Sequence, residues 1–307
     1  VYKRQAVSFD GDTNVLEALV GAGIPITHLC GGKARCSTCR VKIAGGLTHL
    51  SEPSEAEAAM AQRLDFPREI RLACQATASG SVTVRRLVLD RADAQMASQI
   101  GTHGFRGPIG REIEVAVMFT DVAGYTGLAE ALPPYDIVHL LNRFFNGASA
   151  AVAANSGRVD NYMGDAFLAL FGVNNEPGPT VAAIRAGLGV LEVARDLNHY
   201  VERHYSKPFR VRVGVHYGEA VFGLLGAEDT ARETAIGDVV NVASRLESAN
   251  KEVGTDMLVS EAVAAGCGRQ VDFGRSFELD LRGKVGRVTA REVVGLRREL
   301  GRSDEPG

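Results

Sequence analysis

Residues 158–172 read RVDNYMGDAFLALFG, and this stretch decides the fold of the larger part of the chain. Two short β-forming runs flank a tight turn at Met163 and Gly164, which predicts a hairpin of two strands. Asp165 follows directly after the turn. We therefore expect its carboxylate to lie at the edge of a sheet.

The segments on either side of this hairpin alternate between strand and helix patterns. Before the hairpin we expect a strand in IEVAVMF (113–119) that stops at Thr120 and Asp121, and a helix over 136–157 closed by Gly157. After the hairpin we expect a long helix from about Pro179 to Tyr205, strands over 209–218 and 220–226, and a helix over 238–250. The order β-α-β-β-α-β, with further strands after it, predicts an α+β domain whose antiparallel sheet carries helices on one face.

The composition is that of a globular protein and excludes several classes of function. The chain has 307 residues, of which 45% are hydrophobic, and this length suggests about two domains. The net charge of -3 gives no reason to expect a nucleic acid partner. No apolar run is long enough for a membrane span and no signal peptide is visible, so we expect a cytoplasmic protein. The chain begins at Val1 rather than at a methionine, which leaves open whether sequence precedes it.

Residues 30–39 read CGGKARCSTC and hold three of the five cysteines. With Cys74 they form the spacing C-x5-C-x2-C-x34-C, whereas Cys267 stands apart and is expected to be a small structural residue. Such a group can bind metal, form disulfides or lie in a core. Disulfides are disfavoured in a cytoplasmic chain, and zinc ligands usually come as two close pairs. The small residues of the loop let backbone N–H groups approach sulfur, which favours an iron–sulfur cluster over zinc or free thiols.

Residues 6–89 resemble the [2Fe–2S] ferredoxins of the vertebrate-adrenal and bacterial type, in which five residues separate the first two cysteines. The resemblance includes the helix-like TNVLEALVGAGI, the strand RVKI and the RLACQ that contains the last cysteine of the group. It implies a β-grasp domain over residues 1–90, a linker over 91–111, and an electron donor or acceptor protein as a partner. The implied ligands of the [2Fe–2S] cluster are Cys30, Cys36, Cys39 and Cys74.

Two aspartates of the larger domain are candidates for metal binding. Asp121 ends the first expected strand and Asp165 follows the hairpin turn, so the two carboxylates meet at one edge if these strands are neighbours. A pair placed in this way could hold two Mg²⁺ or Mn²⁺ ions. The segment VAGYTG (122–127) opens a helix or turn whose N–H groups could face phosphate oxygens. Taken singly, each aspartate is better explained as a turn residue or a cap than as a metal ligand.

The segments FTDVAGYT, GRVDNYMGDAFLALFG, VRVGVHYG and AIGDVVNVASRLE resemble the motifs of class III nucleotidyl cyclases, in order and at suitable separations. The resemblance implies a ferredoxin-like (βαββαβ) cyclase domain over residues 112–296, followed by a tail over 297–307. In this family two active sites lie at a head-to-tail dimer interface, and each takes its metal ligands from one chain and its base-binding and transition-state residues from the other. A chain with one cyclase domain is therefore expected to form a homodimer.

The same resemblance assigns roles to individual residues. Asp121 and Asp165 bind the metals, and the carbonyl of Val122 is a further ligand. Asn241 orients the ribose and Arg245 stabilises charge on the α-phosphate, and their i,i+4 spacing puts both on one helix face. The triphosphate is implied to meet Lys284 and the segment Val122, Ala123, Gly124, Tyr125 and Thr126.

The residues expected to read the base depart from the family pattern. Asn161 occupies the position of a lysine in adenylyl cyclases, and Thr234 occupies its partner position. An amide can donate or accept, so Asn161 alone rules out neither adenine nor guanine. Thr234 is a type common in bacterial members that make cyclic AMP, and nothing resembles the Glu and Cys of guanylyl cyclases. These observations favour ATP.

The two resemblances together predict a redox-linked adenylate cyclase. The ribose 3′-oxygen would attack the α-phosphate of ATP, releasing pyrophosphate and cyclic AMP, and the cluster would bias the dimer. Two alternatives stay open at this point. One is a guanylate cyclase or a cyclase of relaxed specificity, and the other is an electron-transfer protein whose cyclase-like domain binds nucleotide without turning it over.

Overall fold

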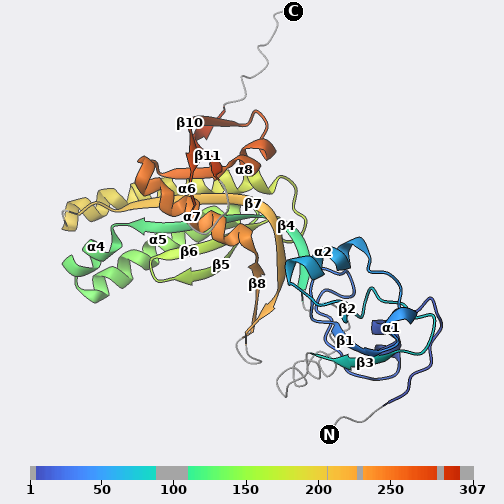
Figure 1. Ribbon diagram of the computed structural model, residues 1–307. Coiled ribbons are helices and arrows are strands. Elements are labelled where there is room, and N and C mark those ends of the chain that lie inside the picture. The colour runs from blue at the N-terminus through green and yellow to red at the C-terminus, as the bar shows by residue number, and fades with distance from the viewer. Residues whose placement is uncertain (1–4, 88–109, 206, 227–230, 282–286, 298–307) are drawn as a thin grey trace, which may run out of the picture. The chain divides into compact units, whose positions relative to one another are not determined.

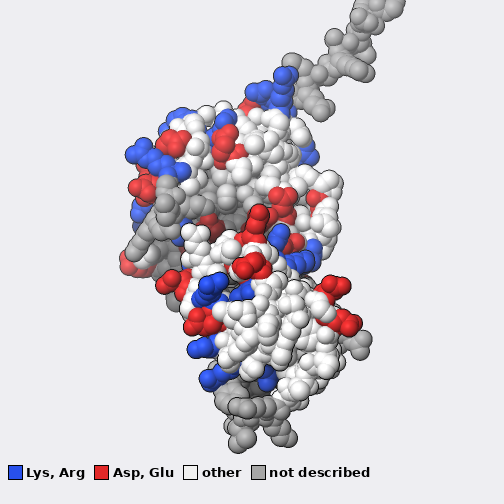
Figure 2. Space-filling model, turned by 45° about the vertical axis from the view of Figure 1, so that its right-hand side comes forward, with Lys and Arg blue, Asp and Glu red and all other residues white. Residues whose placement is uncertain are grey.

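The structure is a computed structural model that describes residues 5–87, 110–205, 207–226, 231–281 and 287–297. The chain divides into two compact units, Val1–Arg111 and Glu112–Gly307, which are described separately below. No helix in these ranges is both long and apolar enough to cross a membrane. Basic and acidic side chains are interspersed on the face shown in Figure 2, in keeping with the small net charge.

The first unit is built on a three-stranded antiparallel sheet in the order β2-β1-β3 (Figure 1). The elements are α1 (Val15–Gly21), β1 (Arg40–Gly45), a 3-10 helix (Leu47–His49), α2 (Glu55–Arg63), β2 (Ile70–Leu72) and β3 (Thr83–Arg86). The helix and the strand expected on either side of the cysteine loop are thus α1 and β1. The last residues of the predicted domain, 88–90, lie outside the described residues.

A buried ion pair holds α2 against β2 in this unit. Glu57 accepts hydrogen bonds from Nε and Nη2 of Arg71, both at 2.9 Å, and from the backbone N–H of Leu72 at 2.7 Å. Both side chains are almost fully buried. Removing either partner would leave a buried charge uncompensated, so this pair fixes the chain two residues before Cys74.

The second unit contains a sheet in the order β10-β11-β9-β7-β4-β6-β5, with β8 paired to β7. Its elements are β4 (Gly110–Ala123), α4 (Tyr125–Ala131), α5 (Pro134–Ala154), β5 (Gly157–Met163), β6 (Ala166–Phe171), α6 (Pro179–Tyr205), β7 (Arg210–Leu225), β8 (Arg232–Ile236), α7 (Asp238–Val253), β9 (Met257–Ser260), α8 (Glu261–Gly266), β10 (Val271–Leu279) and β11 (Val288–Leu296). The run β7-β4-β6-β5 places the fourth, first, third and second strands of a βαββαβ unit side by side. This order confirms the ferredoxin-like prediction.

Helices cover both faces of this sheet, so the expectation of helices on one face was wrong. Ala116 and Met118 of β4 pack with residues of α5 and α6, whereas the alternate residues Val115 and Val117 pack with α7. All six residues of β6 are buried. A strand that is buried on both faces requires packed elements on each face. Helices α5 and α6 cover one face of the sheet, and α7 covers the other.

Helix α7 lies directly on the backbone of β7. A Cβ at Gly214 would stand 2.2 Å from the backbone N of Glu247 and 2.3 Å from the carbonyl O of Ala243. Only glycine permits this approach. The same helix carries the predicted residues Asn241 and Arg245, so this contact positions them.

Several predicted boundaries shift in the structure. The hairpin turn is Gly164 and Asp165, so Asp165 lies within the turn rather than after it. Helix α5 ends at Ala154, and Gly157 begins β5, where a Cβ would stand 2.3 Å from the ring of Phe171. The strands expected over 209–218 and 220–226 form one continuous strand, β7. The last two residues of the segment expected as a linker belong to β4, and residues 91–109 lie outside the described ranges.

Candidate functional site

The β4–β6 ladder brings the two candidate metal ligands together. Thr120 pairs with Phe167, so Asp121 at the end of β4 lies beside the turn that holds Asp165. The two carboxyl groups are half-buried and hydrogen-bonded to each other. Burial, and then the charge and hydrogen bond of Asp165, raise the pKa of Asp121 to about 6. Two carboxyl groups that share a desolvated site in this way are relieved by a bound cation.

Two charged residues beside this pair were not predicted from the sequence. Glu247 of α7 is buried, and burial followed by the charge of Asp121 raises its pKa to about 7. Arg212 of β7 opposes both shifts, because its charge lowers the pKa of Asp121 and of Glu247. A signal was present for Glu247, which is the one charged residue among the mostly apolar buried residues of α7. Arg212 shares its face of β7 with Arg210 and His216, so the sequence pattern did not single it out.

Helix α7 carries Asn241 and Arg245 four residues apart. Asn241 is exposed and Arg245 is half-buried, and Nη1 of Arg245 is buried with no hydrogen-bond partner in the described part of the chain. An unpaired buried donor is costly, and an anionic oxygen would satisfy it. No interaction between these two residues and the paired aspartates is recorded within the described residues of one chain.

The two predicted base-reading residues lie on β5 and β8, and each is hydrogen-bonded to a residue of the other strand. Thr234 donates a hydrogen bond from Oγ1 to Oδ2 of Asp160 at 2.6 Å. Asn161 accepts a hydrogen bond at Oδ1 from Nη1 of Arg232 at 2.7 Å. Asp160 and Arg232 were not predicted as part of this site. Their role depends on a bulge in β5 between Val159 and Asn161, which the sequence pattern does not reveal.

The segment after Asp121 divides between strand and helix. Val122 and Ala123 are the last residues of β4, Gly124 adopts a positive φ of 76°, and α4 begins at Tyr125. The first N–H groups of a helix lack intrahelical partners, so those of Tyr125 and Thr126 are available to an oxygen ligand. Lys284 lies outside the described residues.

The cysteine loop presents four free thiols, two of them in direct contact. Sγ of Cys39 donates to Sγ of Cys74 at 3.5 Å, and Cys36 is hydrogen-bonded to Cys30 and to Oγ1 of Thr38. No three of these side chains converge closely enough within the described residues to form a metal-binding group. The structure therefore brings the predicted ligands together as two pairs.

Hydrogen bonds around Cys74 show that this loop fits an iron–sulfur cluster. The thiol of Cys39, followed by Gln75 and the backbone N–H of Ala34, lowers the pKa of Cys74 to about 6, and sharing that proton raises the pKa of Cys39. Gly31, Gly32 and Ala34 all have positive φ. Such a turn directs backbone N–H groups towards sulfur, as thiolate ligands of iron require.

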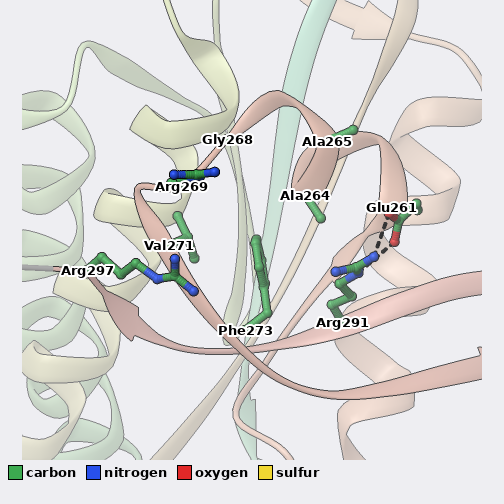
Figure 3. Close-up of a pocket in the computed structure, with 9 residues that line it drawn as sticks. All are labelled: Glu261, Ala264, Ala265, Gly268, Arg269, Val271, Phe273, Arg291 and Arg297. Carbon is green, nitrogen blue, oxygen red and sulfur yellow. Dashed lines mark hydrogen bonds and ion pairs between the residues drawn. The ribbon is translucent and has the colours of Figure 1, made fainter.

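A separate cavity of about 520 Å³ contains none of the predicted residues (Figure 3). It is bounded by α8, β10 and β11. Its lining residues are Glu261, Ala264, Ala265, Gly268, Arg269, Val271, Phe273, Arg291 and Arg297. Arg291 is paired with Glu261 through hydrogen bonds of 2.7 and 2.8 Å. The candidate active site is therefore the surface formed by β4, β6 and α7, and not this cavity.

A ferredoxin-like sheet, paired aspartates at the β4–β6 junction and an Asn/Arg pair on α7 together define a class III nucleotidyl cyclase domain. The family model described as adenylate and guanylate cyclase catalytic domain matches residues 109–293, more than half of the chain. The chain belongs to this family. A model described as 2Fe-2S iron-sulfur cluster binding domain matches residues 2–79. The predicted fusion and the α+β class are thereby confirmed.

Curated relatives share the cyclase part of the chain. Adenylate cyclase 1 of Rhizobium meliloti (strain 1021) is 36% identical over 191 residues, which cover 61% of this chain and 28% of the relative. An adenylate cyclase of Anabaena cylindrica is 31% identical over 182 residues, which cover 58% of this chain and 35% of the relative. The chain thus spans about a third of the length of these relatives.

Solved structures show the same fold. The adenylyl cyclase CyaB from P. aeruginosa is similar with a TM-score of 0.57 and 27% identity, covering 62% of this chain and 99% of that chain. The guanylyl cyclase Cya2 is similar with a TM-score of 0.58 and 24% identity, covering 62% of this chain and 97% of that chain. Both likenesses lie in the cyclase fold, and the second supports the fold alone.

We expect the serine variants of Cys39 and Cys74 to lose the cluster, because a neutral hydroxyl replaces a thiolate ligand. The wild-type protein should hold about two irons per chain, with visible absorbance, and either variant should hold almost none. The matched control is Cys267→Ser, since Cys267 is buried in the other unit and donates to the carbonyl of Val263. Equal iron content in all the proteins would contradict the assignment.

We expect Glu247→Gln to stabilise the protein at alkaline pH. Because the pKa of Glu247 is raised from 4.5 to about 7, its favourable contribution to folding is complete below pH 4.5 and is lost as pH rises through 7. Without divalent metal, the variant should be more stable than wild type by about 2 to 3 kcal/mol at pH 8 and equally stable at pH 4.

Thermal and urea unfolding across this pH range would measure the difference. Glu261→Gln is the control, because Glu261 is half-exposed and paired with Arg291. It should give no gain at pH 8. A Glu247→Gln protein with the same pH dependence as wild type would contradict the burial of a titrating carboxyl group.

Proposed function

We propose that this chain is an adenylate cyclase that converts ATP into 3′,5′-cyclic AMP and pyrophosphate as a homodimer. The observation that carries the proposal is the contact between Asp121 and Asp165 at the β4–β6 junction. Relatives that are named adenylate cyclases support ATP as the substrate. The cyclase domain extends over residues 112–296, and residues 297–307 form a tail.

Asp121 and Asp165 would hold two Mg²⁺ or Mn²⁺ ions, with the carbonyl of Val122 as a further ligand. When bound, such ions lower the pKa of the ribose 3′-hydroxyl and neutralise charge on the triphosphate. In the reaction the bond from O3′ to the α-phosphorus forms and the bond from that phosphorus to the β-phosphate oxygen breaks. The proton of the 3′-hydroxyl passes to solvent. The N–H groups at the start of α4 and the ammonium of Lys284 would contact phosphate oxygens.

The second half of each active site would come from the other subunit. Asn241 would orient the ribose, and Arg245 would offset the charge that develops on the α-phosphate. The unpaired Nη1 of Arg245 supports an anionic ligand at this place. Within the described residues of one chain neither residue interacts with the aspartates, which supports a homodimer as the arrangement that would bring them together.

The N-terminal domain, residues 1–90, would hold a [2Fe–2S] cluster on Cys30, Cys36, Cys39 and Cys74. A linker over residues 91–111 would join it to the cyclase domain. We infer that the redox state of the cluster regulates the cyclase, since the two are fused in one chain. Such coupling requires that the oxidised and reduced clusters interact differently with the active and inactive dimers. An electron donor or acceptor protein would be the physiological partner.

We expect Asp165→Ala to abolish cyclase activity. The substitution removes one of the two carboxylates that would hold the metal ions, so cyclic AMP formation from Mg²⁺-ATP or Mn²⁺-ATP should fall at least about 1,000-fold. The control is Asp272→Ala, which removes an exposed aspartate paired with Arg297 and should retain the wild-type rate. An Asp165→Ala protein that is fully active would exclude the proposed site. A wild-type protein that forms no cyclic nucleotide would favour the alternative, in which the cyclase-like domain binds nucleotide without turning it over.

We expect a change in cyclase rate when the cluster accepts one electron. The rate should differ at least about fivefold between the protein as isolated in air and the protein reduced with dithionite under anaerobic conditions, which is the lower range of allosteric coupling. The Cys74→Ser protein, treated in the same way, should show no change. Identical rates in both redox states of the wild type would remove redox regulation and leave the cyclase assignment intact.

A further inference from the structure

Asn161 is oriented by an arginine that can act only as a donor. Nη1 of Arg232 lies 2.7 Å from Oδ1 of Asn161. A guanidinium has no acceptor, so the amide oxygen must face it and the amide nitrogen must point away. Nδ2 of Asn161 has no hydrogen-bond partner among the residues that the structure describes, and Asn161 is partly exposed. This side chain therefore offers a donor to a ligand.

Thr234 is oriented in the opposite sense. Its hydroxyl donates to Oδ2 of Asp160 at 2.6 Å, because an ionised carboxylate can only accept. The side chain of Asp160 is 1% exposed and lies 3.4 Å from Nη2 of Arg158. The hydroxyl proton of Thr234 is thus committed to Asp160, and its remaining lone pairs can only accept.

The bulge in β5 makes these two contacts possible at once. Arg232 and Thr234 are two residues apart on β8 and share one face of that strand. Their partners, Asp160 and Asn161, are consecutive on β5 and would point to opposite faces of a regular strand. The register of β5 shifts between Val159 and Asn161, which lets both side chains reach β8.

We propose that Arg232 and Asp160 fix the hydrogen-bond polarity of the base site, so that Asn161 donates, Thr234 accepts, and adenine nucleotides are selected. Adenine presents an acceptor at N1 and a donor at its N6 amino group, whereas guanine presents a donor at N1 and an acceptor at O6. The pair matches adenine at both atoms and opposes guanine at both. This inference rests on the proposed cyclase function and names Arg232 and Asp160 as positioning residues.

The test compares kcat/KM for ATP and GTP in one preparation of the full-length protein. Wild type should prefer ATP at least about 100-fold, since a mismatched polar site can reject a substrate by up to about 10,000-fold. Arg232→Met keeps the apolar stem but frees the amide to turn, so the ratio should fall about tenfold, the value of one hydrogen bond. Arg232→Lys retains a donor and should restore most of the ratio.

A second variant addresses the other half of the network. Asp160→Asn can donate to Thr234, which leaves the threonine hydroxyl free to donate to guanine O6, so the same ratio should fall. The ratio is insensitive to lost folding, because misfolded protein lowers both rates equally. Arg297→Gln is the control, since this exposed arginine also makes one short side-chain hydrogen bond, to Asp272 at 2.6 Å, and its ratio should equal that of wild type.

The outcomes separate this inference from the proposed function. A wild type that converts both nucleotides equally, or an unchanged ratio in Arg232→Met, overturns the inference and leaves the cyclase assignment intact. A wild type that converts neither nucleotide contradicts the cyclase function. In that case, displacement of a fluorescent ATP analogue by ATP and by GTP gives the ratio of affinities without turnover, and equal displacement overturns the inference as well.

Discussion

The contact between the carboxyl groups of Asp121 and Asp165 is the constraint on which the larger domain depends. Burial penalises the ionised form of Asp121, the neighbouring Asp165 adds to this cost, and together they raise the pKa of Asp121 to about 6. The backbone ladder between β4 and β6 holds them there. Glu247 adds a third acidic group and Arg212 the opposing charge. This concentration of acidic groups supports the proposal that the site binds cations.

The proposed site for the base of the nucleotide differs from the proposed metal site in the interaction that it uses. The proposed metal site would act through charge, whereas the proposed base site would act through orientation. In our proposal the donor role of Asn161 and the acceptor role of Thr234 follow from their hydrogen bonds to Arg232 and Asp160. The sequence favoured ATP through Thr234, but Asn161 alone ruled out neither base because an amide can act in either sense. The contacts of Arg232 and Asp160 support the proposal that Asn161 acts as the donor.

Much of this architecture could be predicted from the sequence. The bounds of α6 were predicted to the residue because Pro179 marks its first turn and its apolar period is unbroken. The second helical layer was missed because the apolar sequence of a strand such as β6 indicates burial but does not identify the elements that pack on its two faces. The role of Arg232 was missed because its partner, Asn161, lies 71 residues away in the sequence. The role of Glu247 was missed because it depends on Asp121, which lies on a strand of the sheet and not on the same helix.

The close approach at Gly214 also limits how such an enzyme can be switched. At Gly214 no side chain separates α7 from the backbone of β7, so the helix cannot slide along the strand at this point without a steric clash. Arg212, two residues before this glycine, and Arg245, carried by the helix, are therefore expected to move together. In the proposed homodimer, a signal from the cysteine-rich domain would therefore act by rotating one whole subunit relative to the other.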